Sequence, residues 1–221
     1  MSSQLQSGPQ DGDASFTSVF THALRGFPCT VVGLGDDPEP LPMGEWTRDA
    51  DADDLALLAH CEGPTIDIGC GPGRLAAALA ETGRVVLGID VVHEAVGQTR
   101  ERGVPALHRD VFSRLPGEGR WSTALLADGN VGIGGDPVAL LTRTRELIDP
   151  RGRIVVEVAP PGTPHRSIWA VLECEGVRSR PFRWAVVGCD DVSEVAEQAG
   201  LAVSGLHRIG DRWCAVLVEG S

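Results

Sequence analysis

The 221-residue sequence contains neither lysine nor tyrosine, so all 19 of its basic Lys/Arg positions are arginines. Without lysine, the chain cannot form a Schiff base or supply the lysine of a phosphate-binding P-loop. Without lysine and tyrosine, it also lacks the residue pair of short-chain dehydrogenases. These absences exclude the usual reactive groups of several chemistries that occur on open α/β sheets.

Long apolar runs and dense positive charge are absent as well. No apolar run is long enough to span a membrane, and the N-terminal residues lack the regions of a signal peptide. We therefore expect a cytoplasmic protein with no membrane partner. The net charge is −12 and the arginines are scattered among acids, whereas nucleic-acid binding needs a basic stripe. We therefore expect no nucleic-acid partner.

The six cysteines have no spacing typical of a metal or disulfide site. None forms a C-x-x-C pair, and no histidine cluster accompanies them. Together with the lack of a secretory signal, this pattern predicts buried thiols, with no disulfide framework and no metal. They are Cys29, Cys61, Cys70, Cys174, Cys189 and Cys214.

Composition predicts a tail followed by a single domain. Residues 1–15 are small, polar and acidic, which is typical of a disordered segment. Residues 16–221 are long enough for one domain with its own core. Within it we assign residues 16–62 to an N-terminal cap, which opens on an amphipathic helix at 16–24, and residues 63–221 to the core.

Strand and helix signals alternate along the core. This alternation predicts an α/β fold with a doubly wound sheet. Two extended runs, 166–173 and 177–187, flank a Glu175-Gly176 turn and are interpreted as a small insertion after the fifth strand. The chain closes with a predicted hairpin, 201–209 and 212–218.

A glycine-rich turn, Asp67-x-Gly69-x-Gly71-x-Gly73, follows a short β-branched run. Glycines let the backbone turn sharply and approach a ligand, and the helix that follows offers free N–H groups. The dinucleotide fingerprint G-x-G-x-x-G is not matched, because Arg74 fills its third glycine position. The turn therefore indicates a cofactor other than NAD.

Acidic residues end the strands that follow this turn. Asp90 lies about 20 residues after it, where a ribose-binding acid belongs in a βαβ unit, and a carboxylate can accept from both ribose hydroxyls. Asp110 ends the next predicted strand and Asp128 the one after that. Three acids at successive strand ends are more specific than one glycine motif.

This region, from about Gly63 to Glu157, resembles the class I S-adenosylmethionine (SAM) dependent methyltransferases. The resemblance implies a Rossmann-like, seven-stranded sheet whose last strand is antiparallel, and SAM as the cofactor. It implies that Asp67 lies near the amino group of SAM, and that Asp110 accepts a hydrogen bond from adenine. The cofactor-binding residues predicted in this way are Asp67, Gly69, Cys70, Gly71, Gly73, Asp90, Val91, Asp110, Val111 and Asp128.

The methyl acceptor should meet the loops after the fourth and fifth strands, since ligands lie beyond the carboxyl ends of parallel strands. Catalytic candidates there are Asp128, Asn130, Glu157 and His165. Three of them have a structural alternative: Asn130 as a turn residue, Glu157 as an Arg-paired strand end, His165 as a surface residue. Trp46, Trp169 and Trp184 are candidates for an apolar acceptor pocket or for core packing.

The resulting hypothesis is an enzyme that transfers a methyl group from SAM to a small molecule. The chain also resembles small bacterial methyltransferases, which implies a role in secondary metabolism. The alternative is a non-catalytic protein or subunit that binds SAM or S-adenosylhomocysteine. A NAD-dependent oxidoreductase is disfavoured by Arg74 and by the missing tyrosine and lysine.

Overall fold

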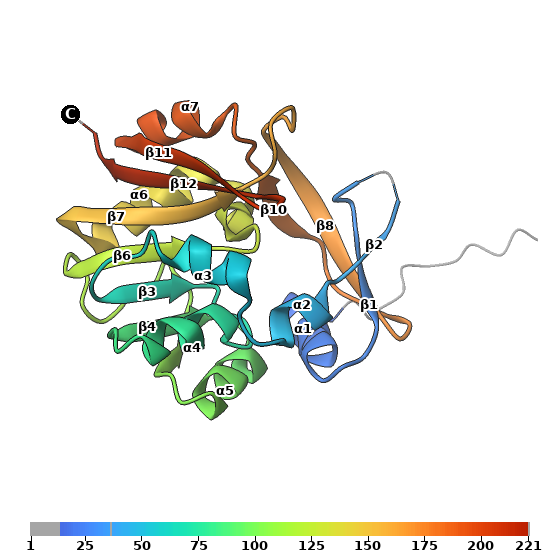
Figure 1. Ribbon diagram of the computed structural model, residues 1–221. Coiled ribbons are helices and arrows are strands. Elements are labelled where there is room, and N and C mark those ends of the chain that lie inside the picture. Colours follow the sequence, from blue (N-terminus) through green and yellow to red (C-terminus); the bar gives the residue numbers. More distant parts are fainter. Residues whose placement is uncertain (1–13, 36, 221) are drawn as a thin grey trace, which may run out of the picture.

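The computed structural model describes residues 14–35 and 37–220 (Figure 1). Most of the predicted disordered tail therefore lies outside the described residues. Its last two residues are placed. Ala14 exchanges backbone hydrogen bonds with Arg178 and Arg180 at 2.9 and 2.8 Å. The hydroxyl of Ser15 accepts from the N–H of Ser18 and caps helix α1, Phe16–Leu24.

The core is a seven-stranded sheet in the order β11-β12-β7-β6-β3-β4-β5. The strands from β7 to β5 are parallel, and β12 runs antiparallel to both β7 and β11. This topology confirms the predicted doubly wound sheet with an antiparallel last strand. The strands span Thr65–Ile68 (β3), Val86–Asp90 (β4), Ala106–His108 (β5), Trp121–Leu126 (β6), Ile148–Val158 (β7), Leu201–Ile209 (β11) and Arg212–Glu219 (β12).

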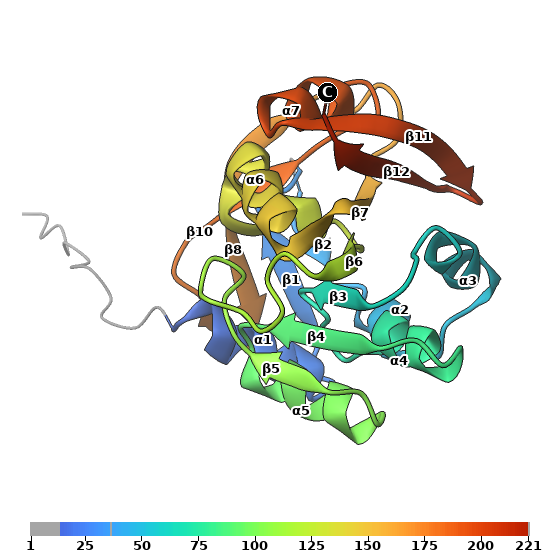
Figure 2. The ribbon, with the colours of Figure 1, turned by 90° about the vertical axis from the view of Figure 1, so that its left-hand side faces the viewer.

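Helices cover both faces of this sheet (Figure 2). Successive strand residues point to opposite faces, so Leu126 packs with helices α6 (Pro137–Leu147) and α7 (Val192–Gln198). Its neighbour Leu125 packs on the other face with α3 (Ala52–Leu58) and α4 (Arg74–Glu81). Helix α3, which we assigned to the cap, therefore belongs to the core. Both leucines are fully buried, and each contributes about 1.5–3 kcal/mol.

The N-terminal segment and the predicted insertion together form a second sheet, in the order β10-β8-β1-β2, which β9 joins through β8 (Figure 1). Helix α1 packs on it through Val19 and Ala23, which contact the apolar side of β8. The predicted run 177–187 is interrupted, because Ser179 turns inward and donates to Arg180 O. The strands span Cys29–Val32 (β1), Glu39–Pro40 (β2), Arg166–Cys174 (β8), Val177–Arg178 (β9) and Phe182–Val186 (β10).

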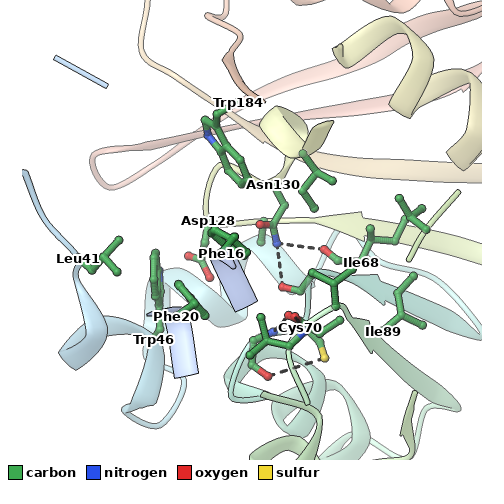
Figure 3. Close-up of a pocket in the computed structure, with 18 of the residues that line it drawn as sticks. Phe16, Phe20, Leu41, Trp46, Ile68, Cys70, Ile89, Asp128, Asn130 and Trp184 are labelled. Carbon is green, nitrogen blue, oxygen red and sulfur yellow. Dashed lines mark hydrogen bonds between the residues drawn. The ribbon is translucent and has the colours of Figure 1, made fainter. Parts of the chain in front are cut away.

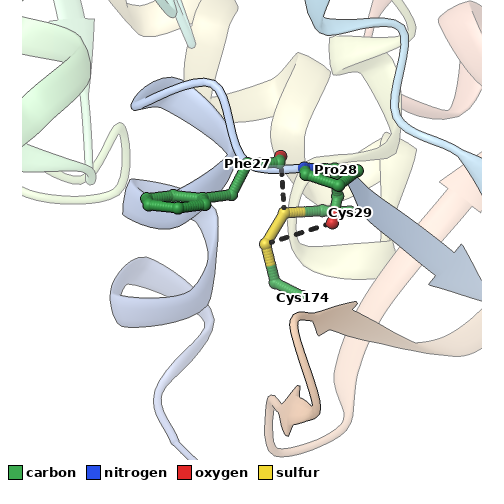
Figure 4. The surroundings of a disulfide bond; sticks show 4 residues. All are labelled: Phe27, Pro28, Cys29 and Cys174. Carbon is green, nitrogen blue, oxygen red and sulfur yellow. Dashed lines mark hydrogen bonds between the residues drawn. A yellow bond between two sulfur atoms is a disulfide. The ribbon is translucent and has the colours of Figure 1, made fainter.

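Cys29 and Cys174 correct the prediction of unpaired thiols, because the structure joins them in a disulfide (Figure 4). They are partners in the antiparallel register of β1 and β8, with Cα atoms 4.3 Å apart. Such close opposition is typical of a non-hydrogen-bonded strand pair. The pairing depends on strands 145 residues apart in the sequence, so cysteine spacing could not reveal it. The other four cysteines are free and buried.

Strand β7 also differs from the prediction at its start. The Pro150-Arg151-Gly152 segment, interpreted as a turn before the strand, lies inside β7. The register with β6 shifts there, from Trp121 opposite Ile148 to Thr123 opposite Arg153. The Pro-Arg-Gly segment therefore interrupts the regular pairing at the start of β7, an interior strand of the sheet.

Candidate cofactor site and adjoining cavity

A cavity of about 690 Å³ lies beyond the carboxyl ends of β3, β4 and β6 and continues under the second sheet (Figure 3). We call its two parts the core end and the cap end. The core end is formed by the glycine turn, the strand ends and the loop after β6, including Asp67, Gly69, Cys70, Gly71, Arg74, Asp90, Val91, Asp110, Val111, Asp128, Asn130 and Ile133. The cap end is formed by Phe16, Phe20, Val31, Leu34, Glu39, Pro40, Leu41, Pro42, Trp46, Leu172, Phe182, Arg183 and Trp184.

The glycine turn joins β3 to α4 as predicted and lines the core end. Gly69 and Gly71 have φ angles of 71° and 53°, a region that favours glycine. The N–H groups of Gly69 and Cys70 both donate to Ile89 O, at 2.9 and 3.0 Å. The turn is therefore held against β4, and its open backbone faces the cavity.

Asn130 holds this turn in place from the loop after β6. Its Nδ2 donates to Ile68 O at 3.0 Å and to Gly69 O at 2.9 Å (Figure 3). A Cβ on Gly69 would lie 2.8 Å from that nitrogen. The left-handed residues of the loop are Asp128, Gly129, Gly134 and Gly135. Asn130 therefore holds the glycine turn in place and is not the left-handed turn residue of our alternative.

Gly73 has a different role from the one we predicted. It does not line the cavity. A Cβ there would lie 2.8 Å from the Cα of Thr99 on helix α5 (His93–Glu101), and its φ is 84°. Gly73 therefore allows α4 and α5 to approach, whereas Gly69 and Gly71 leave room beside the cavity.

Asp67 is a buried acid that faces the core end with an unsatisfied oxygen. The residue is 2% exposed, and its Oδ2 has no hydrogen-bond partner. Burial, followed by the negative charges of Asp128 and Asp90, raises the pKa of Asp67 to about 7. A ligand that brings a cationic N–H donor would satisfy this oxygen and relieve the repulsion. The position therefore fits an amino group.

Asp90 and Asp110 lie at neighbouring strand ends, as their spacing predicted. Asp90 accepts from the N–H groups of Gly71 at 3.0 Å and Val92 at 2.8 Å. Burial nevertheless raises its pKa. Asp110 accepts from the N–H of Phe112 at 2.9 Å and is exposed. Each carboxylate keeps lone pairs for hydroxyl or amine donors.

Two valines complete the strand-end positions that we predicted. Val91 is 41% exposed and follows Asp90, and Val111 is 4% exposed and follows Asp110. Both line the core end. All predicted cofactor residues except Gly73 therefore come together there.

A buried network of charges lies behind the core end. Arg74 is 4% exposed. Its Nη2 donates to both carboxylate oxygens of Asp128 at 2.7 Å, and its Nη1 donates to Asp54. Asp54 also accepts from Arg48 and Arg212, at 2.6 Å each. Burial would raise the pKa of Asp54, but hydrogen bonds from these arginines and from the Asp51 backbone hold it well below its usual range.

This network includes two of the catalytic candidates. The Asp128 carboxylate lines the cavity, and burial raises its pKa although Arg74 opposes the shift. Glu157 does not line the cavity. It accepts from Arg212 at 2.9 and 2.7 Å and from the N–H of Asp128 at 2.7 Å. Glu157 is thus the Arg-paired strand end of our alternative, and it supports Asp128 from behind.

The remaining candidates divide between the cavity and the surface. His165 is exposed and lies outside the cavity. Its backbone N–H donates to the Asp191 carboxylate at 2.6 Å. Trp46 and Trp184 line the cap end. Trp169 does not, because it is 61% exposed, with the Arg183 guanidinium 5.4 Å from its ring.

Sequence reasoning missed the structural role of three charged residues. Arg74 was considered only as the residue that breaks the dinucleotide fingerprint. Asp54 lies within the segment assigned to the cap, and Arg212 begins the second strand of the predicted hairpin. Asp54 and Arg212 are 158 residues apart, so only the fold brings them together. An arginine that directly follows the glycine turn is the one signal that could have drawn attention to the network.

The family comparison agrees with this geometry. Residues 66–156 match the model of a family described as a methyltransferase domain. An uncharacterized protein of Mycobacterium tuberculosis is 31% identical over 113 residues, which cover 51% of this chain and 38% of that protein. The chain thus spans less than half the length of the curated relatives that it matches.

Solved structures show the same fold. A SAM-dependent methyltransferase from Bacteroides fragilis, in complex with S-adenosyl-L-homocysteine, has a TM-score of 0.78 and 20% identity, covering 97% of this chain and 98% of that one. The 1,6-didemethyltoxoflavin-N1-methyltransferase of Burkholderia thailandensis has a TM-score of 0.59 and 20% identity, covering 80% and 81%. The fold and the matched domain are those of a methyltransferase. Residues 66–156 thus match a methyltransferase domain, and the chain shares its fold with these solved methyltransferases.

Among the described helices, none is both long and apolar enough to cross a membrane.

Proposed function

We propose that this chain is a cytoplasmic enzyme that transfers a methyl group from SAM to a small-molecule acceptor, in secondary metabolism. The observation that carries the proposal is one continuous cavity with two unlike ends. The core end has the unsatisfied Asp67 oxygen and the strand-end acids, and the cap end is mostly apolar. A protein that only binds the cofactor needs no cap end, so this geometry favours an enzyme.

The residues of the core end suit the parts of SAM. Asp67 would hold the amino group, Asp90 with Val91 the ribose, and Asp110 with Val111 the adenine. The backbone of the glycine turn leaves room for the methionine part. When bound, SAM supplies a methyl group on a positively charged sulfur. The cap end would exclude water and hold the acceptor in line, and such reactions gain much of their rate from positioning.

The chain's acidity supports a small acceptor over a polyanion. The net charge of −12 opposes binding of DNA or RNA. The 1,6-didemethyltoxoflavin-N1-methyltransferase, a neighbour with the same fold, has its small-molecule substrate bound with S-adenosylhomocysteine. Asp128, held by Arg74, and Asn130 are the catalytic candidates that line the cavity.

Calorimetry with S-adenosylhomocysteine and with NAD tests the cofactor assignment. We expect S-adenosylhomocysteine to bind and NAD to give no heat. Asp90→Asn should weaken S-adenosylhomocysteine at least about tenfold, because charge-assisted hydrogen bonds are worth roughly 1.5–3 kcal/mol. Asp211→Asn, the same change at an exposed acid outside the cavity, should leave the affinity unchanged. Binding of NAD alone would refute the proposal.

A further inference from the structure

The cap end contains a continuous arc of aromatic rings. Between ring centroids, the distance is 6.0 Å from Trp46 to Phe20 and 5.4 Å from Phe20 to Phe16. The ring centroid of Phe16 lies 4.7 Å from that of Phe182. Trp184 continues the arc, 6.4 Å from Phe182. All five side chains are half-buried and line the cavity, opposite Cys70 and Ile89 of the core end (Figure 3). We call this set the aromatic arc.

Charged side chains at the cap end are few. The charged lining residues there are Glu39 and Arg183. The Arg183 guanidinium is committed to the ring of Trp169 on the exposed side of the sheet. Glu39 has no ion pair among the described residues. The adjoining core end adds Asp67, with its unsatisfied oxygen, and Asp128, which Arg74 pairs. It also adds Asp90, Asp110 and Arg109, so that acids outnumber arginines along the whole cavity.

These features discriminate among acceptors by charge. Aromatic faces carry partial negative charge and attract cations. Carboxylates in a partly desolvated cavity attract cations and repel anions such as phenolates and carboxylates. None of the described lining residues is a histidine, and the chain has no lysine or tyrosine. A neutral hydroxyl of high pKa would therefore find only carboxylates and the buried Cys70 thiol, whose pKa burial raises, as ionisable side-chain bases there.

We propose that the methyl acceptor is an amine on an apolar or aromatic body, held by the aromatic arc with its nitrogen toward Asp128. This inference rests on the proposed function. The amine enters protonated and gives one proton to Asp128 or to water. Its nitrogen lone pair then forms the N–CH₃ bond while the S–CH₃ bond breaks, and the sulfur keeps the bonding electrons. The product is a methylammonium ion together with neutral-sulfur S-adenosylhomocysteine.

Three probes with one apolar body test this charge preference: 2-phenylethylamine, 2-phenylethanol and phenylacetate. Each is titrated by calorimetry into protein saturated with S-adenosylhomocysteine. We expect the amine to bind about tenfold more tightly than the alcohol, as a cation–π contact and one carboxylate allow, and phenylacetate to bind most weakly. With SAM in place, mass spectrometry should show methylation on nitrogen.

Two variants that each remove one negative charge test whether Glu39 contributes to the preference for the amine. Glu39→Gln should reduce the advantage of the amine over the alcohol about threefold. Asp37→Asn removes an equal charge from the same exposed segment, outside the cavity, and should leave that advantage unchanged. An alcohol or carboxylate that binds as well as the amine, or a series in which no probe binds, overturns the amine inference. Failure to bind S-adenosylhomocysteine would instead overturn the proposed function, so the two failures are distinguishable.

Discussion

Replacing Arg74 with methionine should destabilise the protein through the acids that it leaves behind. The Arg74 side chain is 3% exposed and lies between Asp54, which is fully buried, and Asp128. Removing one partner of a buried ion pair costs about 3–5 kcal/mol, because an uncompensated charge remains. Asp54 keeps Arg48 and Arg212 at 2.6 Å.

Asp128 keeps only a longer contact, at 3.5 Å from Arg212. We therefore expect the lower end of that range, about 3 kcal/mol, which corresponds to a fall in Tm of about 6–12 °C for a chain of this size. Urea denaturation of the wild type and Arg74→Met measures the difference.

Arg153→Met is the matched control. Arg153 pairs with Glu62 at 2.8 Å, but the two side chains are 29% and 64% exposed. Exposed pairs contribute about 0–1 kcal/mol, so this variant should differ little from the wild type. The double variant Arg74→Met/Asp128→Asn should recover part of the lost stability, because it removes the unpaired charge. An Arg74→Met protein within 1 kcal/mol of the wild type would refute the reasoning.

Two further predictions concern the glycine turn and Asp67. Gly73→Ala should destabilise the protein by about 1–3 kcal/mol more than Gly71→Ala, because a Cβ at Gly73 meets the Thr99 backbone and one at Gly71 meets open space; equal urea midpoints would contradict this. Because the folded pKa of Asp67, about 7, exceeds the value of about 3.9 in an unfolded chain, its stabilising effect is complete below about pH 4 and lost as the pH rises through about 7. Between pH 4 and pH 8, the free energy of unfolding of the cofactor-free wild type should therefore fall by up to about 4 kcal/mol relative to that of Asp67→Asn. Urea midpoints of the two proteins that change equally with pH would contradict this prediction.

Local patterns identified the core end because strand-end positions in a βαβ unit follow from chain order. The spacing of Asp67, Asp90 and Asp110 placed three acids at one edge of the sheet, where the structure has them. Parallel strands with right-handed crossovers leave little freedom in that arrangement. The sequence pattern does not show that Gly73 and Gly71 have different roles. Gly73 contacts helix α5 and Gly71 lines the cavity, and only the packing of α5 decides this.

The sequence suggested an N-terminal cap and named Trp46 and Trp184 as pocket candidates, but it did not show how the cap end is assembled. The second sheet pairs β1 with β8, about 140 residues later in the chain, and it creates both the Cys29–Cys174 disulfide and the aromatic arc.

The sequence by itself determined the fold class, the glycine turn and the acids that line the core end of the cavity, because these depend on local periodicity and on fixed offsets within successive strand–helix units. The tertiary structure alone decided which acids are neutralised. Arg74, Arg212 and Asp54 meet only when α3, α4 and β12 converge, and burial then sets each pKa. Charge pairing and desolvation depend on distances in space, and residue spacing along the chain does not contain them.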